Sequence, residues 1–117
     1  MEKEILNCKE KYSKRALLII NPVSGKKLVI RYIPEIIRRL MDSGYLVTTA
    51  VTSRRGEATD IAAQLGADYD LVCCTGGDGT LNEVISGLAS SDTEVALGYI
   101  PCGSTNDFAA SHGLSID

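Results

Sequence analysis

Hydrophobic positions along the chain alternate between short continuous runs and helical spacing. The continuous apolar runs end at turn residues and predict buried strands over residues 15–21, 45–52, 70–75 and 95–100. Apolar side chains three or four residues apart predict helices over residues 30–41, 57–65 and 81–89. A last short helix is expected over residues 105–112. The chain therefore reads as strand–helix units in series.

Proline and glycine refine the predicted helix boundaries. Pro34 lies within the first helical pattern, so that helix either kinks there or begins just before it. Gly44 and Gly66 follow the first two helical patterns and predict where these helices end.

Alternating strands and helices with short connections predict an α/β fold, with an open, mainly parallel sheet and helices on both faces. Right-handed crossovers place every strand-to-helix loop at one edge of the sheet, where ligands bind in open α/β folds. The loops expected to meet there are 21–27, 52–56, 76–79 and 101–104. We expect residues 15–117 to form one domain, and residues 1–14 to form a charged, partly disordered leader without the apolar stretch of a secretory signal.

Composition narrows the classes of function. Of 117 residues, 44% are apolar, which is enough for the core of one domain. No apolar run approaches the roughly 20 residues of a membrane span, and the net charge of -3 argues against a nucleic-acid partner. The four cysteines show no Cys-x-x-Cys spacing, so we expect reduced thiols in the core of a cytoplasmic protein. Cys73 and Cys74 are adjacent in a predicted strand, so their side chains should point to opposite faces.

The segment Gly76-Gly77-Asp78-Gly79-Thr80 carries the strongest chemical signal. Closely spaced glycines let the backbone come near a ligand, and the helix behind them offers free N–H groups to a phosphate. A carboxylate beside bound phosphate is repelled unless a cation lies between them, so Asp78 implies Mg²⁺. The Walker pattern is absent, and Asn82 stands where a dinucleotide fingerprint needs Gly or Ala.

Simpler explanations exist for several of these residues. Thr80 and Glu83 fit an ordinary capping box at least as well as ligand contact. Arg54 and Arg55 are typical of a solvated surface. Asp107 could cap its helix together with Ser104, or it could share a metal with Asp78.

Three loops together resemble the diacylglycerol kinase catalytic-domain family, within the wider group that includes NAD kinase and phosphofructokinase. The segments that carry the resemblance are Asn21-Pro22-Val23-Ser24-Gly25-Lys26, Gly76-Gly77-Asp78-Gly79-Thr80-Leu81-Asn82-Glu83-Val84 and Pro101-Cys102-Gly103-Ser104-Thr105-Asn106-Asp107-Phe108-Ala109. Ser104 stands where the family more often has Thr, and the hydroxyl is retained. The Asn-Asp-Phe-Ala segment is what favours the lipid kinases over their relatives.

The resemblance implies roles for matching positions. It implies ATP contacts from Asn21, Pro22, Ser24, Gly25, Thr52, Gly76, Gly77, Asp78, Gly79, Thr80, Asn82 and Ser104. Asp78 is the catalytic candidate, and Asp78 and Asp107 would act near Mg²⁺, directly or through water. The family's second, β-rich domain, with the general base, is expected to be absent from this chain.

The function implied is transfer of the ATP γ-phosphoryl group to a hydroxyl of diacylglycerol or a related lipid, this chain being the ATP-binding half. An isolated half is expected to be inactive and to self-associate as a homo-oligomer through an apolar face. We expect the full-length protein to be cytoplasmic, and its peripheral contact with the inner membrane face is left open. The alternatives are a non-catalytic nucleotide-binding module and NAD kinase.

Overall fold

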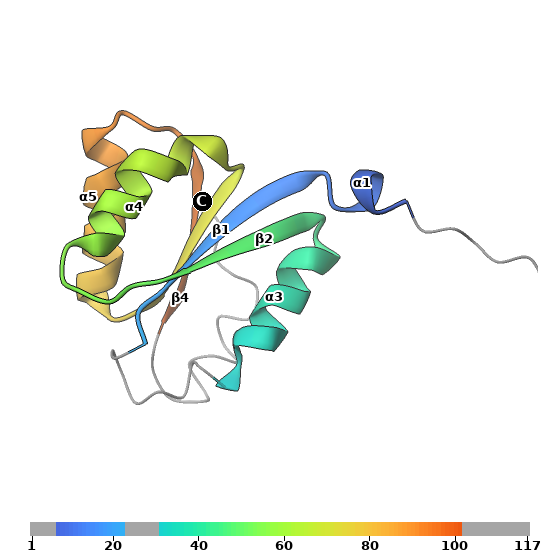
Figure 1. Cartoon of the computed structure of the whole chain (residues 1–117), viewed down its shortest axis with the longest axis horizontal. Coiled ribbons are helices and arrows are strands. Elements are labelled where there is room, and N and C mark those ends of the chain that lie inside the picture. The colour runs from blue at the N-terminus through green and yellow to red at the C-terminus, as the bar shows by residue number, and fades with distance from the viewer. Residues whose placement is uncertain (1–6, 23–30, 102–117) are drawn as a thin grey trace, which may run out of the picture.

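A computed structural model describes residues 7–22 and 31–101 of the chain (Figure 1). One sheet of four parallel strands runs through this part, in the order β2-β1-β3-β4. The strands are β1 (Lys14–Ile20), β2 (Tyr45–Val51), β3 (Leu71–Gly76) and β4 (Ala96–Pro101). In the register of the sheet, Ile20 near the end of β1 lies beside Val51 and Thr75, so these three strands end at nearly the same level.

Helices cover both faces of the sheet. Helix α3 (Ile33–Asp42) packs on one face, and α4 (Glu57–Leu65) and α5 (Asp78–Ser90) lie side by side on the other (Figure 1). The remaining elements are the short helix α1 (Cys8–Lys11) and a 3₁₀ turn, η1 (Gly66–Asp68). The predicted fold class, an open parallel sheet with helices on both faces, is confirmed.

The core consists of two clusters separated by the sheet. Successive side chains of a strand point to opposite faces, so the continuous apolar runs of β1 and β3 supply both clusters. Leu18 and Cys73 pack against α3, whereas Leu17 and Cys74 pack against α4 and α5. The prediction that the adjacent cysteines point to opposite faces is therefore confirmed.

Pro34, Gly44 and Gly66 lie at helix boundaries in the structure. Helix α3 begins at Ile33 with Pro34 in its first turn, so it starts just before the proline, as one of the two alternatives predicted. Gly44 ends α3 in a left-handed conformation with φ of 100°, and its N–H donates to the Met41 carbonyl at 2.9 Å. Gly66 differs: α4 ends before it as predicted, but its φ of −57° continues the chain into η1. Its small size serves packing, since a Cβ there would lie 2.7 Å from Leu88 Cδ2.

Part of the expected N-terminal leader is ordered in the structure. Helix α1 lies inside the expected leader, and β1 begins at Lys14, the leader's last residue. The Asn7 side chain caps α1 by accepting from the Glu10 N–H. The disorder expected for residues 1–6 and the helix expected over residues 105–112 lie outside the described residues. Within the described residues, no helix has the length and apolar character needed to span a membrane.

Candidate functional site

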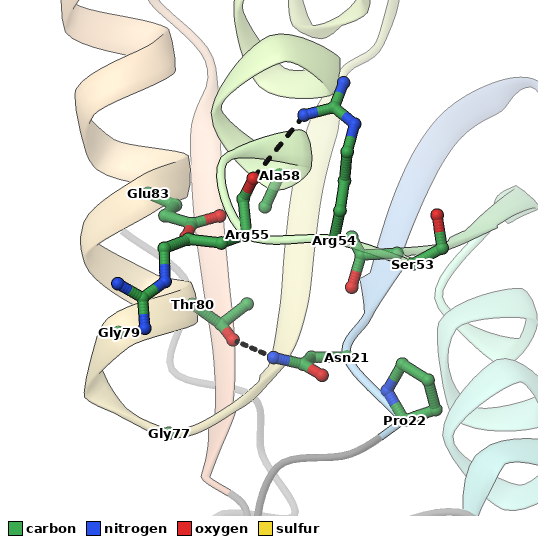
Figure 2. Close-up of a pocket in the computed structure, with 11 residues that line it drawn as sticks. Asn21, Pro22, Ser53, Arg54, Arg55, Ala58, Gly77, Gly79, Thr80 and Glu83 are labelled. Carbon is green, nitrogen blue, oxygen red and sulfur yellow. Dashed lines mark hydrogen bonds between the residues drawn. The ribbon is translucent and has the colours of Figure 1, made fainter.

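The carboxyl ends of β1, β2 and β3 surround a cavity of about 570 Å³ (Figure 2). We call it the carboxyl-edge cavity. Its walls are residues just after β1 and β2, the start of α4 and the first turns of α5. The lining residues are Asn21, Pro22, Thr52, Ser53, Arg54, Arg55, Ala58, Gly77, Gly79, Thr80 and Glu83. The loops predicted to meet at one edge of the sheet do so, as far as the structure describes them.

The start of α5 presents bare backbone to this cavity. Gly76 takes a φ of 142°, which favours glycine, and leads directly to Gly77, the N-cap residue, which has no side chain to cap the helix. The first intrahelical hydrogen bond runs from the Leu81 N–H to the Gly77 carbonyl at 3.2 Å. The N–H groups of the first turn therefore have no acceptor within the helix. A Cβ at Gly77 or Gly79 would meet nothing within 4 Å among the residues that the structure describes. Packing against this part of the chain therefore does not require glycine at these two positions.

The predicted loop 76–79 and the predicted capping box are both corrected by this geometry. Asp78 and Gly79 belong to the first turn of α5 and not to a loop, because the helix begins immediately after Gly77. Thr80 is then already inside the helix, where its hydroxyl cannot act as an N-cap. The sequence prediction was wrong because three glycines in a row of four disfavour a helix by propensity alone.

Thr80 and Glu83 instead bond to residues far away in the sequence. The Asn21 side-chain amide donates to the Thr80 hydroxyl at 3.0 Å, which joins the end of β1 to α5 (Figure 2). A Glu83 carboxylate oxygen accepts the Gly56 N–H at 3.1 Å, which joins the loop after β2 to the same helix. These two bonds fix the walls of the carboxyl-edge cavity relative to one another.

The loop after β2 is held at both of its ends. The Thr52 N–H and hydroxyl both donate to the Ile20 carbonyl, at 2.8 and 3.3 Å. The Ser53 N–H and hydroxyl donate to the Glu57 carboxylate, and these hydrogen bonds lower the pKa of Glu57. The loop thus reaches the cavity with a defined backbone path.

Two arginines of this loop line the cavity. Arg54 and Arg55 are exposed, as predicted, but both belong to the cavity wall. Arg54 pairs with Asp60 at 3.2 Å, whereas Arg55 forms no ion pair with any residue in 7–22 or 31–101. Their exposure agrees with the solvated surface expected from the sequence. Their place in the cavity wall follows from the position of the loop, at the edge of the sheet where ligands bind in open α/β folds.

The predicted site residues divide into three groups. Lining the carboxyl-edge cavity are Asn21, Pro22, Thr52, Gly77, Gly79 and Thr80. Close by in the sequence but not in its lining are Gly76, Asp78 and Asn82. Outside the described residues are Ser24, Gly25, Ser104 and Asp107. Lining residues that the sequence did not select as ligand contacts are Ser53, Arg54, Arg55, Ala58 and Glu83.

Metal-binding groups are sparse in the part of the chain that the structure describes. No cluster of three or more His, Cys, Asp or Glu side chains there could hold a metal ion. Asp78 is exposed in the first turn of α5. A cation at this edge would need ligands beyond the described side chains, such as the oxygens of a bound phosphate.

Comparison with known proteins identifies the family. The family model of the diacylglycerol kinase catalytic domain matches residues 15–117. Diacylglycerol kinase of Bacillus subtilis (strain 168) is 40% identical over 102 residues, which are 86% of this chain and 34% of the relative. That of Staphylococcus saprophyticus is 43% identical over 105 residues, 89% of this chain and 34% of the relative.

A solved structure agrees with the sequence relatives. The crystal structure of a diacylglycerol kinase from Bacillus anthracis (strain Sterne) superimposes with a TM-score of 0.69 at 31% identity, covering 86% of this chain and 37% of that one. The chain thus spans about a third of the length of the curated relatives it matches. On its sequence match and its fold, the chain belongs to the diacylglycerol kinase catalytic-domain family.

Proposed function

We propose that this chain is the ATP-binding part of a lipid kinase that transfers the γ-phosphoryl group of ATP to a hydroxyl of diacylglycerol or a related lipid. The observation that carries the proposal is the start of α5, where Gly77 and Gly79 leave the backbone open to the carboxyl-edge cavity. Free N–H groups and the positive end of a helix favour a phosphate at such a place. Membership of the family supplies the reaction type.

The cavity offers contacts suited to a nucleotide. Its volume of about 570 Å³ is in the range of small-molecule sites. Asn21, Thr52 and Thr80 provide amide and hydroxyl groups, and the backbone of α5 provides donors for the phosphates. Phosphoryl transfer depends mainly on positioning and charge neutralisation, so such a cradle is an appropriate contribution from this part of the protein.

We propose that Asp78 and Asp107 hold Mg²⁺, directly or through water. Mg²⁺ at phosphate sites uses one or two carboxylates together with phosphate oxygens and water, so the single exposed Asp78 in the first turn of α5 fits this kind of site. When bound, the ion would neutralise charge developing on the phosphates. Within the chain, Asp78 would hold it next to the phosphate cradle.

The lipid pocket and the general base would lie in parts of the protein beyond this chain, since the match covers only 34% of each relative. Because the proposed acceptor is a membrane lipid, the full-length protein would be cytoplasmic and would contact the inner membrane face peripherally. The isolated 117-residue chain should bind ATP without phosphorylating lipid.

The test is a phosphorylation assay on a protein that carries this chain together with the family's second domain. Labelled ATP would be offered with diacylglycerol in vesicles, and separately with NAD. We expect labelled lipid and no labelled NAD, and we expect Asp78→Asn to abolish the transfer while circular dichroism shows an unchanged fold.

Other outcomes would contradict specific parts of the proposal. Full activity of Asp78→Asn would rule out its metal role. Labelled NAD without labelled lipid would identify an NAD kinase. ATP binding without transfer to either acceptor would identify a nucleotide-binding module.

A further inference from the structure

Arg55 lines the carboxyl-edge cavity, and its guanidinium group has no partner among the residues that the structure describes. The side chain is exposed, and it forms neither an ion pair nor a hydrogen bond with another residue in the described ranges 7–22 and 31–101. Its neighbour Arg54 differs, because that guanidinium donates to Asp60 at 3.2 Å and to the Arg55 carbonyl at 3.4 Å. Of the two adjacent cations, Arg55 is the one available to a ligand.

The backbone next to Arg55 is fixed to the side of α5 that faces the cavity. The Gly56 N–H donates to Glu83, and Glu83 and Gly79 are four residues apart on α5, so they share one face of the helix. Both residues line the cavity. Figure 2 shows the Arg55 guanidinium extending from its loop toward Gly79, at the first turn of α5.

The charges around this point favour an anion. Among the described residues that line the cavity, Glu83 is the acid, and its carboxylate already accepts the Gly56 N–H. Asp78, in the first turn of α5, lies outside the lining. The start of α5 contributes the positive end of a helix. A guanidinium beside it adds a planar fork of donors that matches phosphate oxygens.

We propose that Arg55 binds the phosphate chain of the nucleotide and sets the preference of the cavity for a polyphosphate over an uncharged nucleoside. The inference rests on the proposed function, because it presumes a nucleotide in the carboxyl-edge cavity. The alternative use of a guanidinium is stacking on the purine. Arg55 and Gly79 line the same cavity, and the guanidinium is directed toward the bare backbone at the first turn of α5 (Figure 2), which favours the phosphates.

The experiment compares ATP with adenosine by titration calorimetry, using wild-type protein, Arg55→Gln, Arg55→Lys and Arg39→Gln. Arg39→Gln is the control, since it removes the same charge from an exposed ion pair, with Glu35 on α3, that lies outside the cavity lining. We expect Arg55→Gln to weaken ATP binding about tenfold, the size of a lost hydrogen bond to a charged group, and to leave adenosine binding unchanged. Arg55→Lys should restore part of the loss. Arg39→Gln should stay within about twofold of wild type, because it lies outside the cavity and exposed ion pairs contribute little.

Three results would overturn the inference. The first is an equal loss of ATP and adenosine affinity in Arg55→Gln, which would place the guanidinium on the base. The second is an equal loss of ATP affinity in Arg39→Gln and Arg55→Gln, which would reduce the effect to overall charge. The third is unchanged ATP affinity in Arg55→Gln. Failure of the wild-type protein to bind ATP at all would instead refute the proposed function, and this inference with it.

Discussion

Cys73 and Cys74 illustrate how burial determines the chemistry of a single side chain. Both lie on β3, a central strand covered on both faces, and neither is exposed to solvent. Removing a thiol from water disfavours its charged form, and this raises the pKa of each cysteine to about 12. The thiolate is the reactive species, so both thiols should be inert near neutral pH.

Alkylation should therefore distinguish these cysteines from the exposed Cys8. At about pH 8, iodoacetamide should label Cys8 in the folded protein but leave Cys73 and Cys74 unmodified, and urea should expose all of them. Between their unfolded pKa of about 8.5 and their folded pKa of about 12, the unfolded state releases protons that the folded state keeps, so stability should fall as the pH rises. Peptide mass spectrometry reads out the labelling. Rapid labelling of Cys73 in the folded protein would contradict its burial.

The pairing of α4 with α5 depends on small residues where the two helices meet. A Cβ at Gly87 of α5 would overlap the Thr59 carbonyl oxygen and come within 2.9 Å of Ala62 Cβ on α4. Ala58 and Ala62 are buried in the same layer. Glycine is required at Gly87 for close packing, whereas at Gly79 of the same helix there is open space.

Gly87→Ala tests this packing. Although alanine favours a helix, we expect the variant to lose about 1–3 kcal/mol of unfolding free energy, because an extra methyl group must push the two helices apart. Urea denaturation followed by circular dichroism measures the difference. Stability equal to or above wild type would show that α4 and α5 are less closely packed than described.

At the scale of elements, local pattern predicted most of the structure. The strand limits agree within one residue, and the bounds of α4 agree fully, because buried strands and amphipathic helices leave distinct hydrophobic spacing. The start of α5 was misplaced, since its glycines conceal the helix. The bonds Asn21–Thr80 and Glu83–Gly56 join residues 59 and 27 positions apart, and no local pattern contains such contacts.

For the whole molecule, topology alone predicted which edge of the sheet carries the site. The carboxyl ends of parallel strands meet at one edge, and the cavity lies there. The loop after β2 folds against α5, and this contact determines which side chains line the cavity. No local pattern contains the contact, so Arg55 and Glu83 were not selected as ligand contacts. The outer strand β2 also leaves large apolar side chains exposed, Leu46 at 56% and Val51 at 59%.

This exposed strand makes self-association of the isolated chain a specific prediction. An open sheet edge with apolar side chains pairs readily with another copy, and a lysine there opposes pairing. Sedimentation velocity over a concentration series should show association of the wild-type chain and less of it for Leu46→Lys. Ile85→Lys is the control, because Ile85 is similarly exposed, at 45%, but lies on α5. A monomer at every concentration, or equal effects of both variants, would contradict the role of β2.

The central claim is that ATP phosphates lie against the bare first turn of α5, and Gly79→Ala tests it most directly. The added methyl group meets no atom of the described residues within 4 Å, and Gly79 itself lines the carboxyl-edge cavity. Replacing a helical glycine should raise the unfolding free energy by as much as about 1 kcal/mol. Calorimetric titration with ATP should nevertheless show affinity at least about tenfold weaker than wild type, because the backbone can no longer approach the phosphates. A folded Gly79→Ala variant that binds ATP as tightly as wild type would contradict the account.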